Sequence, residues 1–92
     1  MSKREKRLQK LRQNYKNASF EDLRLVLEDF GFELLRSSGS HHTFKITIND
    51  VSRQLVVPYR RPVKSIYVTQ ALALIDNVIA FQEEQAKDEN DD

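Results

Sequence analysis

The sequence predicts a single α+β domain in the order α-β-β-β-α, with a three-stranded antiparallel sheet and two helices on one face of it. Three observations support this prediction. Apolar residues recur at helical spacing in residues 20–30 and 65–81. Residues 42–48 alternate between polar and apolar side chains, as a half-buried strand does. The length of 92 residues suits one domain rather than two.

The first predicted helix covers residues 20–30. Ser19 is followed three positions later by Asp22, which resembles the capping box at the start of a helix. Gly31 can adopt the left-handed conformation that ends a helix. The apolar stripe of this helix consists of Phe20, Leu23, Val26, Leu27 and Phe30.

Three short strands are predicted next, at residues 32–36, 42–48 and 53–57. The first two are separated by the turn residues Ser37, Ser38, Gly39 and Ser40, and the last two by Asn49 and Asp50. Pro58 ends the third strand because proline lacks the N–H that a strand donates. The second helix, residues 65–81, carries an apolar stripe of Val68, Ala71, Leu72, Ile75, Val78 and Ile79.

The period of two assigns the faces of the middle strand. The side facing the helices consists of His42, Phe44, Ile46 and Ile48. The opposite side is expected to be exposed and consists of His41, Thr43, Lys45 and Thr47. Both helices must cover their apolar stripes, so we expect them on the Phe44 side. The His41 side is then left to solvent or a partner.

The two ends of the chain have opposite charge. Residues 1–16 carry seven basic residues and one acidic residue, and residues 83–92 carry six acidic residues and one basic residue. We expect a basic extension over residues 1–18, the folded domain over 19–82 and an acidic disordered tail over 83–92. The extension could form a helix with a narrow apolar stripe, and its role as a nucleic-acid arm or as a solvated leader stays open.

Basic charge also collects in the middle of the chain, where residues 36–64 carry six basic residues and one acidic residue. Such a surface fits a polyanion, and Arg36 and Arg53 are expected to border the exposed sheet face. His41 lies within this basic stretch, directly after the Gly39-Ser40 turn. An imidazole titrates near neutral pH and can move a proton during RNA cleavage, for which RNA supplies its own 2′-hydroxyl nucleophile.

Several classes of protein are excluded or disfavoured by the composition. The sequence has no cysteine, which excludes disulfides, thiolate catalysis and cysteine-bound metal. No apolar run is long enough to span a membrane, and we expect a cytoplasmic protein without a cofactor. His41 and His42 point to opposite faces of a strand, so we expect no metal site built on both. Ser40 is expected to be a turn residue rather than a nucleophile.

Three segments of the chain resemble the HicA toxin family, also called YcfA-like. They are the run from Gly31 to Arg36, the run Gly39-Ser40-His41-His42-Thr43-Phe44 and the run Leu55-Val56-Val57-Pro58, within a match of about residues 19–80. The resemblance implies a fold like that of the double-stranded-RNA-binding domain. It also implies a toxin that cleaves mRNA without a metal and is neutralised by a HicB-type antitoxin. The chain departs from the family at Arg60, where many relatives carry a second histidine.

The resemblance places the family's catalytic histidine at His41, and the glycine and serine before it at Gly39 and Ser40. We expect phosphate contacts from the nearby cations, which are Arg36, Lys45, Arg60 and Arg61. Two alternatives stay open at this point. The same basic face could bind RNA without cleaving it, or could bind an acidic protein partner and no RNA.

Overall fold

The computed structural model describes residues 2–90 and contains the five predicted elements in the predicted order, preceded by one further helix and by no additional strand in that range. The helices are α1 (Lys3–Gln13), α2 (Phe20–Asp29) and α3 (Ser65–Asn90). The strands are β1 (Glu33–Ser38), β2 (His41–Ile48) and β3 (Val51–Pro58). The α+β class is therefore confirmed.

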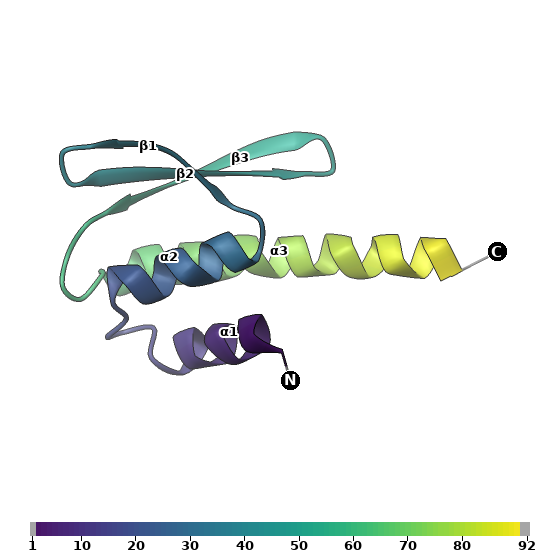
Figure 1. Cartoon of the computed structure of the whole chain (residues 1–92), viewed down its shortest axis with the longest axis horizontal. Coiled ribbons are helices and arrows are strands. Elements are labelled where there is room, and N and C mark those ends of the chain that lie inside the picture. The colour runs from purple at the N-terminus through teal and green to yellow at the C-terminus, as the bar shows by residue number, and fades with distance from the viewer. Residues whose placement is uncertain (1, 91–92) are drawn as a thin grey trace.

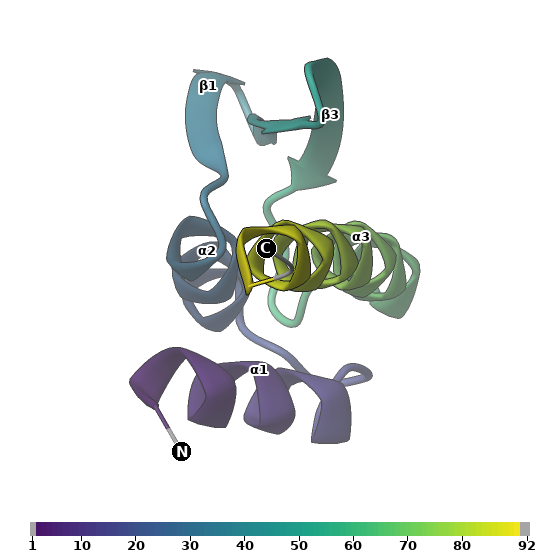
Figure 2. The same ribbon diagram turned by 90° about the vertical axis from the view of Figure 1, so that its right-hand side faces the viewer.

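The elements form three layers (Figures 1 and 2). The sheet is the first layer, with strand order β1-β2-β3 and antiparallel pairing throughout. Helices α2 and α3 form the second layer and cover one face of the sheet, as predicted. Helix α1 forms the third layer, on the side of α2 and α3 that faces away from the sheet (Figure 2). None of the described helices is long and apolar enough to cross a membrane.

The first sheet-covering helix begins and ends where local sequence signals placed it. The Ser19 hydroxyl accepts a hydrogen bond from the Asp22 N–H at 3.1 Å, which caps α2. Gly31, with φ of +93°, follows the helix and turns the chain toward β1. The apolar side of α2 is buried against the sheet and α3, and this core contains Leu23, Val26, Leu27, Phe44, Leu55, Val57, Val68 and Ile75.

The predicted faces of the middle strand are correct, with one difference in burial. Phe44 and Ile46 are buried toward the helices, as expected. Thr43 lies on the opposite face but is only 5% exposed, so the expectation of an exposed hydroxyl there was wrong. The cause is its place in the central strand, because Arg36 and Val56 lie opposite Thr43 on the two edge strands and flank its side chain.

Arg53 also lies elsewhere than expected. It is the cross-strand partner of Ile46, and residues directly opposite each other in a sheet point to the same face. Arg53 is therefore on the face that carries the core, near the Asn49-Asp50 turn, and does not border the exposed face. The register explains this position, because the two-residue turn Asn49-Asp50 pairs Ile48 with Val51 and therefore Ile46 with Arg53, on the same face as the buried Leu55 and Val57.

Both ends of the chain are more ordered in the structure than the sequence suggested. Helix α1 packs on α2 through Leu8 and Leu11, which are 7% and 3% exposed, so it is part of the fold rather than a loose extension. Helix α3 continues to Asn90 instead of ending near Phe81 (Figure 1). Glutamate, glutamine, alanine and lysine dominate residues 82–87, and their good helix propensity extends the helix without a buried face. The last two residues of the predicted tail, 91–92, lie outside the described part of the chain.

Candidate functional site

His41 is the first residue of β2 and directly follows the two-residue turn Gly39-Ser40. Gly39 has φ of +59°, a left-handed conformation that glycine adopts without strain, and this turn starts β2. The cross-strand partners of His41 are Ser38 on β1 and Pro58 on β3. Its side chain is exposed on the face of the sheet that no helix covers. We call this face, defined by Arg36, His41, Thr43, Lys45 and Val56, the outer face.

His42 points the other way and is half-buried, as predicted. Its ring lies 4.6 Å from the ring of Phe20 and 6.2 Å from the ring of Tyr59, measured between centroids. Its Nδ1 atom lies 3.3 Å from the Ser40 carbonyl oxygen. These contacts give His42 a packing role. Two adjacent histidines are thus held on opposite sides of one strand, so they cannot ligate a single ion together.

The cations predicted to hold phosphate do not all lie near His41. Arg36 is paired with Thr43, one row along the outer face from the row that contains His41. Lys45 is four residues along β2, about 13 Å away at roughly 3.3 Å per residue. Lys45 also has an acidic cross-strand partner, Glu33. The outer face therefore offers Arg36 as the strand cation nearest to His41, while Lys45 belongs to the far half.

The loop after β3 brings two further arginines to the same end of the sheet. The Tyr59 N–H donates a hydrogen bond of 2.6 Å to the Ser40 carbonyl oxygen, which ties the start of this loop to the turn before His41. Arg60 follows directly and is exposed. Arg61 is placed by Tyr59, because its Nε donates to the Tyr59 hydroxyl at 3.1 Å and its guanidinium lies over the Tyr59 ring at 5.9 Å. This hydrogen bond, followed by the electrostatic influence of Tyr59, raises the pKa of Arg61 above its ordinary value.

Tyr59 and Phe20 are site residues that the sequence interpretation missed. Their rings pack at 5.2 Å, and together with Arg61 and Pro62 they border a hollow of about 390 Å³ at the start of α2. We call this the Tyr59 hollow. A signal was present in the sequence, because an aromatic residue among basic residues, as in Tyr59-Arg60-Arg61, is typical of single-stranded nucleic-acid binding.

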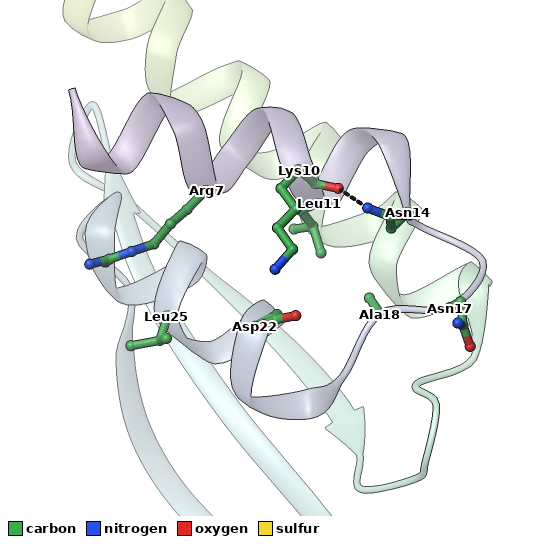
Figure 3. A pocket seen from close by; sticks show the side chains of 8 residues that line it. All are labelled: Arg7, Lys10, Leu11, Asn14, Asn17, Ala18, Asp22 and Leu25. Carbon is green, nitrogen blue, oxygen red and sulfur yellow. Dashed lines mark hydrogen bonds between the residues drawn. The ribbon is translucent and has the colours of Figure 1, made fainter. Parts of the chain in front are cut away.

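A second hollow, of about 360 Å³, lies between α1 and α2 (Figure 3). Leu11, Ala18 and Leu25 give it apolar walls, and Lys10 and Asp22 extend toward it from the two helices. It is separated from the outer face by the layer of α2 and α3 (Figure 2). Because of this separation, it cannot form one site with His41.

Three arginines of α1 contact side chains of α2, α3 or the residue after α2. The Nη1 atom of Arg7 donates to both carboxylate oxygens of Asp29 at 2.8 Å each, and Arg12 pairs with Asp76. Arg4 lies over the Phe30 ring at 5.0 Å. These contacts explain why a basic helix docks here, since α2 and the facing part of α3 supply the acidic and aromatic partners. The segment is therefore docked on α2 and α3, and its role toward nucleic acid stays a prediction.

Within residues 2–90, no three or more side chains of the types His, Asp and Glu gather in a group that could hold a metal ion. The arrangement around His41 can instead offer one imidazole, the nearby Arg36 guanidinium and the two arginines that follow Tyr59. That set can bind a phosphodiester and move one proton on it. No protein-family model, curated protein or solved structure matches this chain.

Proposed function

We propose that this chain is a metal-independent endoribonuclease of the HicA type, which cleaves mRNA and is neutralised by a HicB-type antitoxin in the cytoplasm. The observation that carries the proposal is the position of His41. It is exposed on the outer face, beside a glycine turn, and its end of the sheet also carries Arg36, Arg60 and Arg61. The resemblance of the Gly39-Ser40-His41 segment to the HicA family supports the same reaction.

The reaction needs only one proton-transferring group. The neutral imidazole of His41 takes the proton from an RNA 2′-hydroxyl, and the 2′-oxygen attacks the adjacent phosphorus. A bond from phosphorus to the 2′-oxygen forms and the bond to the 5′-oxygen breaks, which leaves a 2′,3′-cyclic phosphate. The leaving 5′-oxygen receives a proton from the imidazolium. Arg36 and Arg60 stabilise the negative charge that develops on the phosphoryl oxygens.

The open shape of the site favours single-stranded RNA. His41 and Arg36 lie on the uncovered face of the sheet, and a strand of RNA can lie across such a face with its phosphates on the arginines. The fold order α-β-β-β-α from α2 to α3 also agrees with the double-stranded-RNA-binding domain that the resemblance implies.

A second candidate function is RNA binding without cleavage on the same face. The observation that favours it is that, among residues 2–90, no second histidine lies beside His41 on the outer face to share the proton transfer. His42 is committed to packing against Phe20, and Arg60 stands where many HicA relatives have a second histidine. In this case the arginines still bind the RNA phosphates, but His41 transfers no proton and the RNA is not cleaved.

The test is cleavage of a labelled single-stranded RNA by purified protein in the presence of EDTA. The wild type is expected to produce fragments with a 2′,3′-cyclic phosphate end. His41→Ala should cleave about 10²- to 10⁴-fold more slowly, the usual contribution of a positioned acid–base group, and should still bind the RNA. Gln54→Ala, on the exposed edge strand β3 and two rows from His41, is the control for a change on the same face.

Each outcome assigns a function. Equal cleavage by His41→Ala and the wild type would refute the role of His41. Binding without cleavage by the wild type would select the RNA-binding module. Absence of binding even at low salt would reject both and leave the interaction with an acidic protein partner.

A further inference from the structure

We infer that the Tyr59 hollow binds one unpaired nucleobase of the RNA, stacked on the Tyr59 ring and the Arg61 guanidinium. The inference rests on the proposed function, which places an RNA phosphate at His41. The base in the Tyr59 hollow belongs to the nucleotide beside that phosphate. It also extends that function, since neither the His41 chemistry nor the phosphate contacts require an aromatic site.

The lining of the hollow has the chemistry of a base-stacking site. Tyr59 is 39% exposed and lines the hollow, with its ring packed on Phe20 and the Arg61 guanidinium over the ring at 5.9 Å. Aromatic rings and arginine guanidinium planes are the groups on which unpaired RNA bases stack. The volume of about 390 Å³ lies within the roughly 300–1,000 Å³ typical of small-molecule sites.

The stacking surface is held in place before any ligand arrives. The Tyr59 ring rests against Phe20 and His42, and its backbone N–H is bonded to the Ser40 carbonyl. Arg61 is held by the Tyr59 hydroxyl. A hydrogen bond of 3.0 Å from the Val63 N–H to the Ala18 carbonyl joins the loop to the segment before α2, which forms the other wall. A preformed site loses little entropy when a base enters.

The position of the hollow relative to His41 fits a single strand of RNA. Pro58 is the cross-strand partner of His41, and Tyr59 is the next residue of the same chain. The Tyr59 ring packs on Phe20 and His42, on the helix-covered side of the sheet, whereas His41 is on the outer face. A nucleotide at this end of the sheet can therefore place its phosphate at His41 and direct its base around the sheet end into the hollow.

The hollow offers hydrogen-bonding groups suited to the edge of a base. Glu21, in the first turn of α2, lines it together with Arg61, and the Glu21 carboxylate also accepts a hydrogen bond of 2.7 Å from Arg24. The carboxylate of Glu21 and the amide oxygen of Asn17 can accept hydrogen bonds from the amino groups of a base. The proposed arrangement thus separates the two parts of a nucleotide, with the phosphate beside His41 on the outer face and the base at Tyr59 and Arg61 on the other side of the sheet end.

The experiment uses a short single-stranded RNA with 2-aminopurine at one position and a 2′-deoxy sugar at the cleaved position, so that binding is measured without cleavage. Moving the 2-aminopurine along the strand should reveal one position whose fluorescence is quenched by the wild-type protein. Tyr59→Leu should abolish that quenching and raise Kd roughly 5- to 150-fold, the range for loss of base stacking on an aromatic side chain. An abasic residue at the same position should weaken wild-type binding and have no further effect on Tyr59→Leu.

Two arginines provide a matched control. Arg60→Ala and Arg61→Ala remove the same charge from neighbouring exposed positions, but only Arg61 lies on the Tyr59 ring. Arg61→Ala should reduce the quenching, and Arg60→Ala should weaken binding while the quenching at saturation stays the same. Circular dichroism of Tyr59→Leu and Tyr59→Phe verifies folding, and Tyr59→Phe should keep the quenching because the ring remains.

The inference and the proposed function can fail separately. If the wild type cleaves RNA with His41 but Tyr59→Leu and the abasic RNA change neither Kd nor quenching, the base site is overturned and the nuclease stands. If the quenching depends on Tyr59 and Arg61 but no RNA is cleaved, the base site stands on an RNA-binding module. If the wild type binds no RNA at low salt, both are overturned and the hollow is left to a protein partner.

Discussion

The two faces of the sheet are built from the same three strands and differ in almost every property. The inner face, defined by Phe44, Ile46, Leu55 and Val57, is buried under α2 and α3. The outer face carries His41, Arg36 and Lys45, and apart from Thr43 its side chains are exposed or half-buried. The adjacent residues His41 and His42 show the contrast within one strand. Residues that stabilise the fold therefore alternate along the strand with residues that we propose to contact RNA. Substitutions on the inner face should change stability, and substitutions on the outer face should change RNA binding or cleavage.

The largest expected effect on stability is that of Phe44→Ala on the inner face. Phe44 is fully buried, and removal of its ring leaves a cavity between the sheet and the helices. The free energy of unfolding should fall by about 3–5 kcal/mol in a urea titration. The control on the outer face is Val56→Ala, whose side chain is 44% exposed and whose loss should cost no more than about 0.5 kcal/mol. Equal losses would mean that the two faces are packed alike.

The second prediction compares the two histidines in the same titration. His42→Ala should lower the free energy of unfolding by about 1–1.5 kcal/mol, because its ring packs on Phe20 and Tyr59. His41→Ala should change it by less than about 0.5 kcal/mol, because its ring is exposed. Reversal of this order would show that the strand register differs from the one described.

The third prediction compares two arginines on opposite faces. Arg36→Ala should weaken RNA binding by about 1.5 kcal/mol, roughly tenfold in Kd, if Arg36 holds a phosphate. It should also flatten the dependence of log Kd on log salt concentration by about 0.7, the contribution of one phosphate contact with a single strand. Arg53→Ala removes the same charge from the core-bearing face and should leave that slope unchanged. An identical slope change in both variants would mean that only net charge matters.

Local patterns predicted the part of the molecule that surrounds His41. The Ser19 cap, the alternation along β2 and the Gly39-Ser40 turn each depend on neighbouring residues, and each is confirmed in the structure. The opposite orientations of His41 and His42 follow from the alternation along β2 alone, without any knowledge of distant contacts.

The features that sequence reasoning missed depend on residues far apart in the chain. The docking of α1 buries Leu8 and Leu11 and places Arg7 and Arg12 beside Asp29 and Asp76, and a narrow apolar stripe alone does not reveal these partners. The burial of Thr43 depends on what the two edge strands place beside it. The Tyr59 hollow joins the loop after β3 to the start of α2, across some forty residues of sequence.

The smallest expected effect is that of Gly39→Ala, which tests how the turn keeps the two faces apart. A Cβ atom on Gly39 would meet nothing within 4 Å, so any cost comes from its φ of +59°. A left-handed residue other than glycine costs about 1–2 kcal/mol, and the less flexible unfolded chain of the variant returns about 0.4–1 kcal/mol. The net loss in a urea titration should therefore be about 1 kcal/mol, and Gly39→Asn should lose less because asparagine tolerates this conformation.

Gly31→Ala is the matched comparison, because Gly31 also has a positive φ but its added Cβ would lie 3.4 Å from the Ile46 Cδ1 atom. It should therefore cost at least as much as Gly39→Ala. A slip of β2 by one residue would exchange the faces of His41 and His42. In Gly39→Ala, nuclear Overhauser contacts between the rings of His42 and Phe20 should persist, which would show an unchanged register. Their replacement by contacts from His41 to Phe20 would show that Gly39 is needed to keep His41 on the outer face.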